Sequence, residues 1–296
     1  MSDLNFGDCI GCGLCILGCP AYEETGFDVL TARGRNKALQ AGLTAAEMTE
    51  SIWACTMCGY CDAICPNEVH NVAIVLHLRR ELAGDGGVRL SASANAAADR
   101  HAAPCGLVLG CTIRERAPHL IPSIEAFLAR IGRPLKAAGD EGCCGSLEVE
   151  AGRAMPARRR AGVVADPICL EQYDAEFLGL LAMQHLEQFD LPRPFYYFAP
   201  HRLVNRDHAR AYPLYDTLRR RFGCDTNLDL NRLARSTSAG SVQGLSGEQS
   251  RDIRAAVERL LAHSRAERVI TCSPADYLAF KAYSRRETLF ITECLR

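Results

Sequence analysis

The chain has 296 residues, 48% of them apolar, and a formal net charge of −1. This length favours two domains with a packed core, and the near-neutral charge gives no sign of nucleic acid or an anionic membrane as a partner. The sixteen cysteines are unusual for such a chain. Because the start of the sequence lacks a signal-peptide pattern and no apolar run is long enough to span a bilayer, we expect a cytoplasmic protein whose thiols bind metal.

The first hundred residues contain the same cysteine motif twice. C-I-G-C-G-L-C-I-L-G-C-P begins at Cys9, C-T-M-C-G-Y-C-D-A-I-C-P begins at Cys55, and both follow the spacing C-x2-C-x2-C-x3-C-P. This is the run of bacterial two-cluster ferredoxins, in which the fourth cysteine of each run binds the cluster of the other run. A pair of zinc sites is the weaker alternative, because zinc ribbons use pairs of cysteines. The motifs therefore predict two [4Fe-4S] clusters with these ligands: Cys9, Cys12, Cys15 and Cys65 for cluster one, and Cys55, Cys58, Cys61 and Cys19 for cluster two.

Helical patterns surround both motifs. Residues 31–43, 44–55 and 71–84 are predicted to be helices, in regions where a small ferredoxin would have strands. We therefore expect residues 1–84 to form an all-α ferredoxin domain. Residues 85–104 are rich in Gly, Ala and Ser and are predicted to be a linker.

The rest of the chain alternates short apolar strands with helices. Strands are predicted at residues 105–110, 161–166, 194–200 and 268–271, and helices at 119–132, 167–186, 208–223, 247–264 and 273–284. This alternation favours a parallel sheet covered by helices, and the pattern occurs twice. The predicted fold class is therefore α + α/β, with a duplicated α/β domain whose halves are residues 105–192 and 193–296.

Reactive side chains follow several of the predicted strands. Cys111, Cys169, Cys272 and His201 each lie just past a strand, at the edge of a parallel sheet that usually carries the chemistry. Two adjacent cysteines and a glycine, C-C-G at residues 143–145, lie between the first two strands. Adjacent thiols are poor partners for a disulfide with each other, so this pair calls for another explanation.

The pattern of Cys111, C-x31-C-C-G and then Cys169 resembles the cysteine-rich CCG domain. That domain occurs twice in one of the subunits of heterodisulfide reductase, and also in the iron–sulfur subunits of glycolate oxidase and anaerobic glycerol-3-phosphate dehydrogenase. The ferredoxin region resembles a second, ferredoxin-like subunit of heterodisulfide reductase or the front half of the dehydrogenase subunits. T-A-R-G-R at residues 31–35 is similar to the Arg-Gly-Arg/Lys segment that those subunits carry between their cluster motifs. The resemblance covers nearly the whole chain, as if the two heterodisulfide reductase subunits were fused.

The resemblance implies a further metal site in the first half. Each family repeat has five cysteines that hold a multi-iron cluster of unusual shape, in which adjacent thiolates bind or bridge different irons. The first half keeps four of these five positions, and the fifth is an aspartate that can also ligate iron. The implied ligands are Cys111, Cys143, Cys144 and Cys169, with Asp166 as the candidate fifth. Either a third iron–sulfur cluster or zinc would suit this set.

The second half has lost most of the family's ligands. His201, Ser238, Ala239 and Ala275 stand where the family has cysteines, and only Cys272 remains. One cysteine and one histidine are too few for a cluster, so we interpret the second repeat as degenerate.

Together these features favour an iron–sulfur electron-transfer subunit of an oxidoreductase complex. It would relay electrons between a flavoprotein partner and a quinone or a thiol/disulfide acceptor, and could associate peripherally with a membrane through its partners. A partner is needed because the sequence contains no phosphate-binding loop and no flavin fingerprint. The alternative is a heterodisulfide-reductase-like catalytic subunit that reduces a disulfide at a CCG-bound cluster. A third possibility is a binding module in which the CCG site holds structural zinc.

Overall fold

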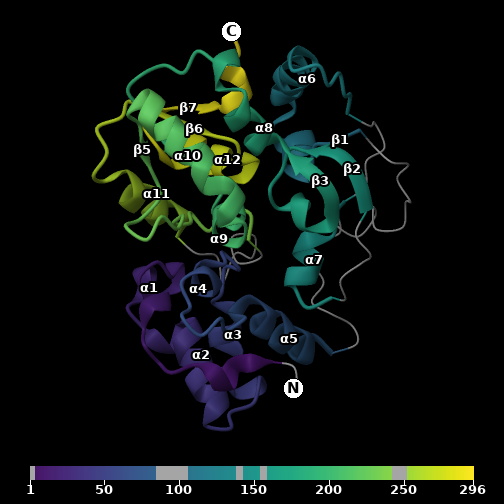
Figure 1. The fold of residues 1–296 in the computed structure, drawn as a ribbon. Helices are drawn as coiled ribbons and strands as arrows, with labels where there is room; N and C mark the ends of the chain where they lie inside the picture. The colour runs from purple at the N-terminus through teal and green to yellow at the C-terminus, as the bar shows by residue number, and fades with distance from the viewer. Residues whose placement is uncertain (1–3, 85–105, 138–142, 154–158, 242–251) are drawn as a thin grey trace.

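The computed structural model describes residues 4–84, 106–137, 143–153, 159–241 and 252–296. A helical N-terminal domain lies below two α/β units that stand side by side (Figure 1). The predicted fold class, α + α/β with parallel sheets, is confirmed. The predicted linker, residues 85–104, lies outside the described residues.

The N-terminal domain consists of short helices joined by tight turns. Thr31 caps the second helix, since its hydroxyl accepts a hydrogen bond from Gly34 N at 3.2 Å. A Cβ on Gly34 would lie 2.4 Å from the backbone oxygen of Asp28, so the glycine of T-A-R-G-R lets this helix pack closely on the preceding turn. The helices are α1 (Pro20–Thr25), α2 (Ala32–Gln40), α3 (Thr49–Trp53), α4 (Tyr60–Ala63) and α5 (Asn71–Ala83).

The first α/β unit is a three-stranded parallel sheet in the order β1-β2-β3. Its strands are β1 (Leu107–Val108), β2 (Arg159–Val164) and β3 (Tyr173–Phe177), and its helices are α6 (Ile121–Arg130), α7 (Ser146–Glu150) and α8 (Leu178–Gln184). The predicted helix over 167–186 is wrong in its first half, where a 3-10 turn and β3 stand instead. The stretch Y-D-A-E-F alternates apolar and polar side chains with the period of a strand, and only the apolar run after it is helical.

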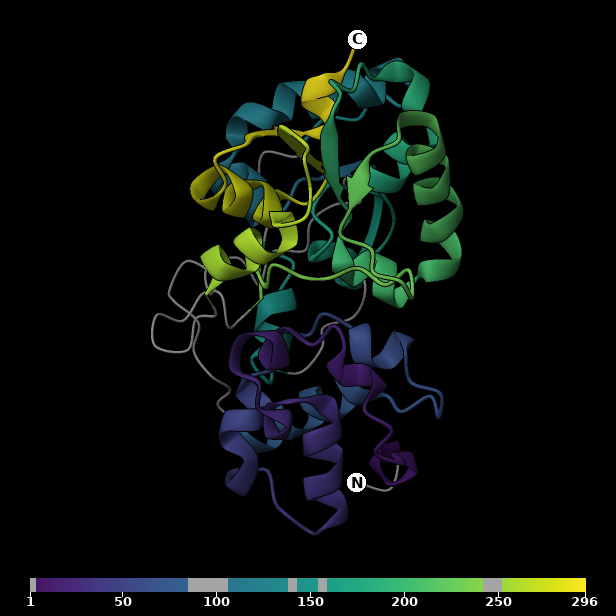
Figure 2. The same cartoon turned by 90° about the vertical axis from the view of Figure 1, so that its left-hand side faces the viewer.

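The second α/β unit is a four-stranded parallel sheet in the order β5-β4-β6-β7. Helices α11 and α12 cover one face and α10 covers the other (Figure 2). This explains the wholly apolar strand F-Y-Y-F, because Tyr196 and Phe198 pack towards α11 and α12 while Phe195 and Tyr197 pack towards α10. The elements are β4 (Phe195–Phe198), α9 (His201–Arg206), α10 (His208–Phe222), β5 (Asp225–Thr226), α11 (Ile253–Leu261), β6 (Arg268–Thr271), α12 (Pro274–Tyr283) and β7 (Glu287–Phe290).

The two sheets have corresponding strand orders. Ala137 forms a parallel bridge with Leu107 on β1, and β5 occupies the corresponding place beside β4. Side chains from both sheets belong to one apolar core, with Val163 and Phe177 from the first and Ile270 from the second. The two units therefore have corresponding strand orders, and they pack as one body.

A buried arginine joins the N-terminal domain to the α/β body. Arg79 on α5 has no exposed surface, and its guanidinium donates to Glu150 O at 2.8 Å and to Cys55 O at 2.6 Å. Gly152, in the turn after α7, has φ +98°, and a Cβ there would lie 2.6 Å from Arg79 O. Only a residue without a side chain permits this close contact between the two domains.

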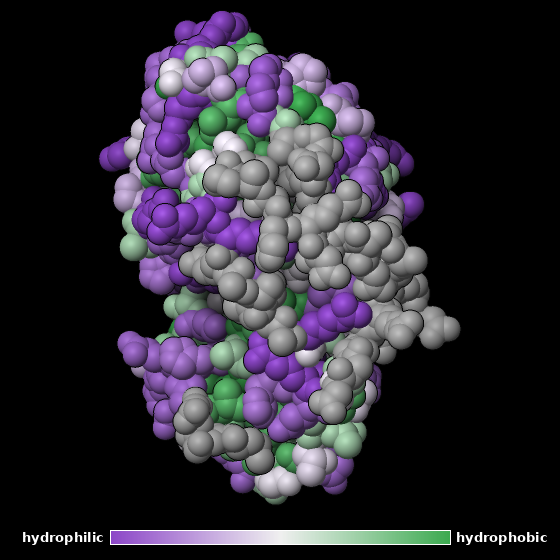
Figure 3. All heavy atoms as spheres, turned by 90° about the vertical axis from the view of Figure 1, so that its right-hand side faces the viewer, coloured by the Kyte–Doolittle hydropathy of each residue, from purple (hydrophilic) through white to green (hydrophobic). Residues whose placement is uncertain are grey.

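The length and apolar character of the described helices bear on whether any of them could span a membrane. On the face shown in Figure 3, hydrophilic residues cover most of the described surface and apolar residues show in small patches. None of the helices in the described ranges is long and apolar enough to cross a bilayer.

Replacing Gly152 with alanine should destabilise the protein through the domain contact. Gly223→Ala is the matched control, because Gly223 also has positive φ but nothing lies within 4 Å of its added Cβ. Both variants lose about 1–2 kcal/mol to the left-handed backbone, and Gly152→Ala should lose ~1–3 kcal/mol more from overpacking against Arg79. Chemical denaturation of the two variants measures the difference, and equal losses would show that the contact contributes nothing.

Candidate iron–sulfur sites

The first motif and one cysteine of the second line a common cavity. Cys9, Cys12 and Cys15 face it together with Cys65, and Cys61 also borders it. Gly11 and Gly13 have φ +76° and +85°, which lets the loop turn tightly around the cavity. Lys37 donates to Cys9 O at 2.8 Å and so holds the loop on α2.

The second motif and one cysteine of the first line a second cavity. Cys55, Cys58 and Cys61 face it with Cys19, and Cys15 also borders it. Burial is the main cause that raises the pKa of Cys58 to about 12, with the nearby thiols adding to the shift. Such thiols stay protonated until a cation replaces the proton, as metal binding requires. Four sulfur donors around each cavity fit a [4Fe-4S] core, which supplies one-electron redox chemistry when bound.

Donors from distant parts of the chain hold the loop of the second motif. Asn205 Nδ2 donates to Cys58 O at 3.0 Å, and Arg206 donates to Met57 O at 3.1 Å. Arg79 donates to Cys55 O from the other side. The cluster-two loop, residues 55–59, thus faces the α/β body. Sequence reasoning missed Asn205 and Arg206, because no motif marks them.

The four cysteines of the first α/β unit come together at the ends of its strands. A hydrogen bond with Cys143 raises the pKa of Cys111 and lowers that of Cys143. Hydrogen bonds with Cys143 and Cys169 raise the pKa of Cys144. These interactions join the thiols in the order 111, 143, 144 and 169. The four line a cavity of about 240 Å³, which we call the thiol cavity.

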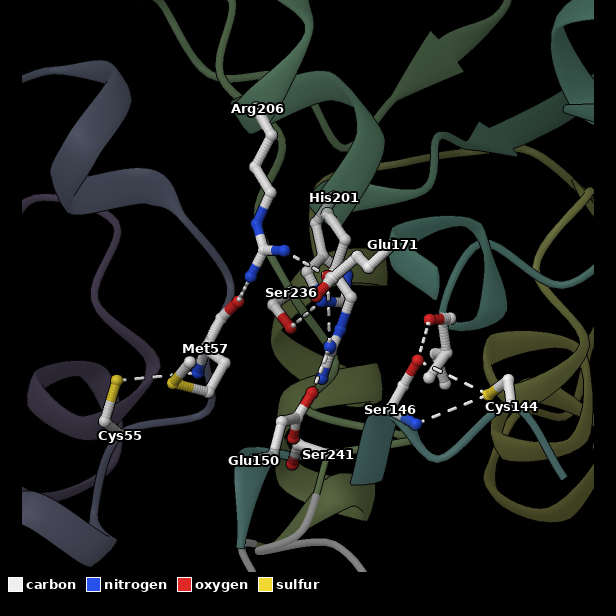
Figure 4. Close-up of polar contacts among 12 residues, drawn as sticks. Cys55, Met57, Cys144, Ser146, Glu150, Glu171, His201, Arg206, Ser236 and Ser241 are labelled. Atoms are coloured by element: carbon white, nitrogen blue, oxygen red, sulfur yellow. Dashed lines mark hydrogen bonds and ion pairs between the residues drawn. The ribbon is translucent and has the colours of Figure 1, made fainter. Parts of the chain in front are cut away.

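The glycine of C-C-G turns the backbone so that its amides point at the paired sulfurs. Gly145 has φ +81° and begins helix α7, with Gly145 N donating to Cys143 Sγ at 3.4 Å and Ser146 N donating to Cys144 Sγ at 3.5 Å. Figure 4 shows Ser146 beside Cys144. Ser146 Oγ donates to Ile168 O at 2.8 Å, in the turn after β2. Donated hydrogen bonds favour the charged sulfurs that metal binding needs.

Asp166 also borders the thiol cavity. Burial raises the pKa of its carboxyl to about 6, and its Oδ1 accepts from Ile168 N at 2.9 Å. Gly110, which sequence reasoning missed, makes room for this side chain. A Cβ on Gly110, at φ +82°, would lie 2.9 Å from Asp166 Cβ and 3.0 Å from Cys169 Sγ. A glycine directly before Cys111 was the available signal.

The second α/β unit contributes no sulfur to the thiol cavity. Cys272 has no exposed surface and accepts a hydrogen bond from Tyr197 Oη at 3.2 Å inside the core. His201 Nε2 lies 3.2 Å from Ser236 Oγ, and burial lowers the pKa of its imidazole to about 3. The cavity wall from this unit carries Ala239, Gly240 and Ala275 instead. Within the described ranges, no group of three or more His, Cys, Asp and Glu side chains has the arrangement that would hold a single metal ion.

Replacing Cys19 with serine should damage the cluster held by the second motif. Cys19 borders the cavity of Cys55, Cys58 and Cys61, although it belongs to the first run. Electron paramagnetic resonance of the reduced protein should show cluster two altered or lost and cluster one retained. Cys224→Ser is the control, because Cys224 lines neither cavity. Loss of the signal from cluster one alone would contradict the cross-ligation.

The N-terminal region has recognisable relatives. Residues 5–69 match the family model described as a 4Fe-4S dicluster domain. The fumarate reductase iron–sulfur subunit of Haemophilus influenzae is 30% identical over 93 residues, which cover 27% of this chain and 36% of the relative. That of Shigella flexneri is 28% identical over 81 residues, covering 24% and 33%. The chain thus spans about a third of the length of the curated relatives it matches, and residues 5–69 form a 4Fe-4S dicluster domain.

Proposed function

We propose that this chain is an electron-transfer subunit that relays electrons between a flavoprotein partner and an acceptor at the thiol cavity. The dicluster domain and the similarity to iron–sulfur subunits support the relay role. The observation that carries the proposal is that the loop of the second motif faces the α/β body. This loop contacts α9 of the α/β body, and the four remaining site cysteines lie in that same body. Cluster two is therefore the inner centre, and cluster one is the outer one.

The surroundings of cluster one suit the approach of a partner. Cys12 is exposed, and several large apolar side chains of the first motif are exposed as well. Ile10 is 66% exposed, Leu17 57% and Leu14 40%, all three within the first motif. Apolar side chains left in water near a redox centre are suited to a protein interface. We assign this surface to the flavoprotein, because the chain itself shows no flavin or nicotinamide fingerprint.

The third centre in this proposal occupies the thiol cavity. Cys111, Cys143, Cys144 and Cys169 supply four sulfur donors, and Asp166 is a candidate fifth ligand. Adjacent thiolates converge poorly on one iron but can bind different irons, so the pair favours a cluster of non-cubane shape. Structural zinc is the alternative occupant.

The thiol cavity also provides room for the acceptor. Beyond the sulfurs, its wall carries alanines and the apolar side chains of Leu278 and Tyr283 on α12. A quinone ring or a small disulfide could reach the third centre through this space. Reduction of a disulfide at the centre is the second candidate function. The observation that favours it is that all four cysteines line the cavity that a disulfide would enter.

The purified chain should not oxidise a hydroxy acid unless a flavoprotein is added. It should nevertheless accept electrons from a reduced flavoprotein or from an artificial donor, because both ferredoxin clusters can cycle without the partner. Stopped-flow bleaching of the cluster absorbance measures the transfer. Substrate turnover by the single chain would refute the relay role, and copurification with a flavoprotein would support it over disulfide reduction.

Anaerobically purified protein should contain about twelve irons, four for each of three clusters. Cys144→Ser should remove about four of them and leave both ferredoxin signals unchanged, whereas Cys294→Ser, outside all three cavities, should remove none. Eight irons with one zinc would establish the structural-zinc alternative. Eight irons with no other metal would leave Cys143 and Cys144 as a thiol pair without a metal and end the three-centre proposal.

A further inference from the structure

One arginine connects the cluster-two loop to the 3-10 turn that begins at Cys169, one of the cysteines of the thiol cavity. Arg206, the last residue of α9, donates from one terminal nitrogen to Met57 O at 3.1 Å and forms an ion pair with Glu171 through the other. Glu171 lies in the 3-10 turn Cys169–Gln172, two residues after Cys169. Figure 4 shows Arg206 and Glu171 between Met57 and the region of Cys144 and Ser146.

A second set of charged contacts connects the same regions and is more deeply buried. Arg202 is 4% exposed, forms an ion pair with Glu150 and lies 3.6 Å from Glu171. Glu150 ends helix α7, which begins directly after C-C-G. Arg79 in turn donates to Glu150 O and to Cys55 O. Two of the three segments that carry cysteines of the thiol cavity, the turn of Cys169 and the helix after C-C-G, are thus tied by charged side chains to the cluster-two loop.

We propose that Arg206 is a positioning residue for electron transfer between cluster two and the thiol cavity, and that its charge also raises the reduction potential of cluster two. The inference rests on the proposed function. Electron tunnelling weakens steeply with each through-space gap between groups. The two contacts of the Arg206 guanidinium, which we call the Arg206 fork, are the hydrogen bond to Met57 O and the ion pair with Glu171. They replace such a gap between the cluster-two loop and the turn of Cys169. The planar guanidinium can make both contacts at once, which a lysine ammonium on a flexible stem does not.

The effect on the potential follows from charge. Reduction adds one electron to a cluster that is already negative, so a nearby cation stabilises the reduced form. Arg206 contacts the loop itself, and a Cβ on Gly59 would lie 3.3 Å from Arg206 Cγ. Without this guanidinium, Glu171 would be left facing the loop with only the more distant Arg202. The potential of cluster two should therefore fall when Arg206 is neutralised.

Three variants separate the two roles. Arg206→Gln removes both the charge and the fork, and Arg206→Lys keeps the charge but loses the fork. Arg210→Gln is the control, because Arg210 is 63% exposed and pairs only with Asp207 among the described ion pairs. Iron content and circular dichroism of each variant establish that the clusters and the fold are intact before any comparison.

Redox titration followed by electron paramagnetic resonance tests the potential. Arg206→Gln should shift the reduction equilibrium of cluster two about tenfold towards the oxidised form, which corresponds to ~59 mV for one electron. Arg206→Lys and Arg210→Gln should stay near the parent value. The titration can be repeated in the Cys144→Ser protein, so it does not depend on the third centre. An unchanged potential in Arg206→Gln overturns the electrostatic role.

Rapid-freeze quenching after mixing with a reductant tests the positioning. Both Arg206 variants should lose the fast phase in which the third centre is reduced after cluster two, while Arg210→Gln keeps it. If Arg206→Lys retains that phase, the fork has no positioning role and the inference is overturned on this point. Absence of any third-centre signal in the parent protein would instead refute the proposed function, and the titration would still decide the electrostatic role.

Discussion

The buried guanidinium of Arg79 is the interaction on which the arrangement of the redox sites depends. A cation without access to water is costly unless it is hydrogen-bonded, and here the carbonyls of Ile52, Cys55 and Glu150 accept from its two terminal nitrogens, while its Nε has no partner among the described residues. These three carbonyls belong to the cluster-two loop, to the helix before it and to the helix after C-C-G. The requirement to satisfy one charge therefore fixes two site-bearing segments relative to each other, and Gly152 allows the backbones to approach closely enough.

The grouping of cysteines around each cavity could be predicted from the sequence where local spacing determines it. In the two ferredoxin runs the gaps are short, and a loop with glycines at positive φ brings the sulfurs to one cavity whatever the rest of the chain does. The same holds for the left-handed glycine of C-C-G. The sequence alone does not bring Cys111 and Cys169 to Cys143 and Cys144. Predicting that contact also requires the rule that parallel strands end at a common edge of the sheet.

Contacts between distant segments could not be predicted in this way. Asn205 and Arg206 reach the cluster-two loop across 147 and 149 positions of sequence, and α9 carries no pattern that separates it from an ordinary amphipathic helix. Strand β3 was missed for a different reason. The apolar run of α8 follows it without a break, so the helical signal extended over a five-residue strand. Propensity arguments fail where one short element abuts a longer one of another type.

The second α/β unit has a strand order that corresponds to that of the first, without the group of cysteines that the first unit carries at its cavity. Gly240 has φ +73° and Gly145 has φ +81°, so the turn that follows the paired positions keeps the same hand in both halves. Ala239 and Ala275 border the thiol cavity from this unit. Cys272 has no such contact, because it packs against Gly179 and Tyr197 in the core, where a buried thiol behaves as a small apolar side chain. The second sheet packs on apolar side chains such as Tyr196, Phe198 and Phe280. Its small residues leave open the space beside the four sulfurs, and this space is what would allow an acceptor to reach a metal centre held by the first half.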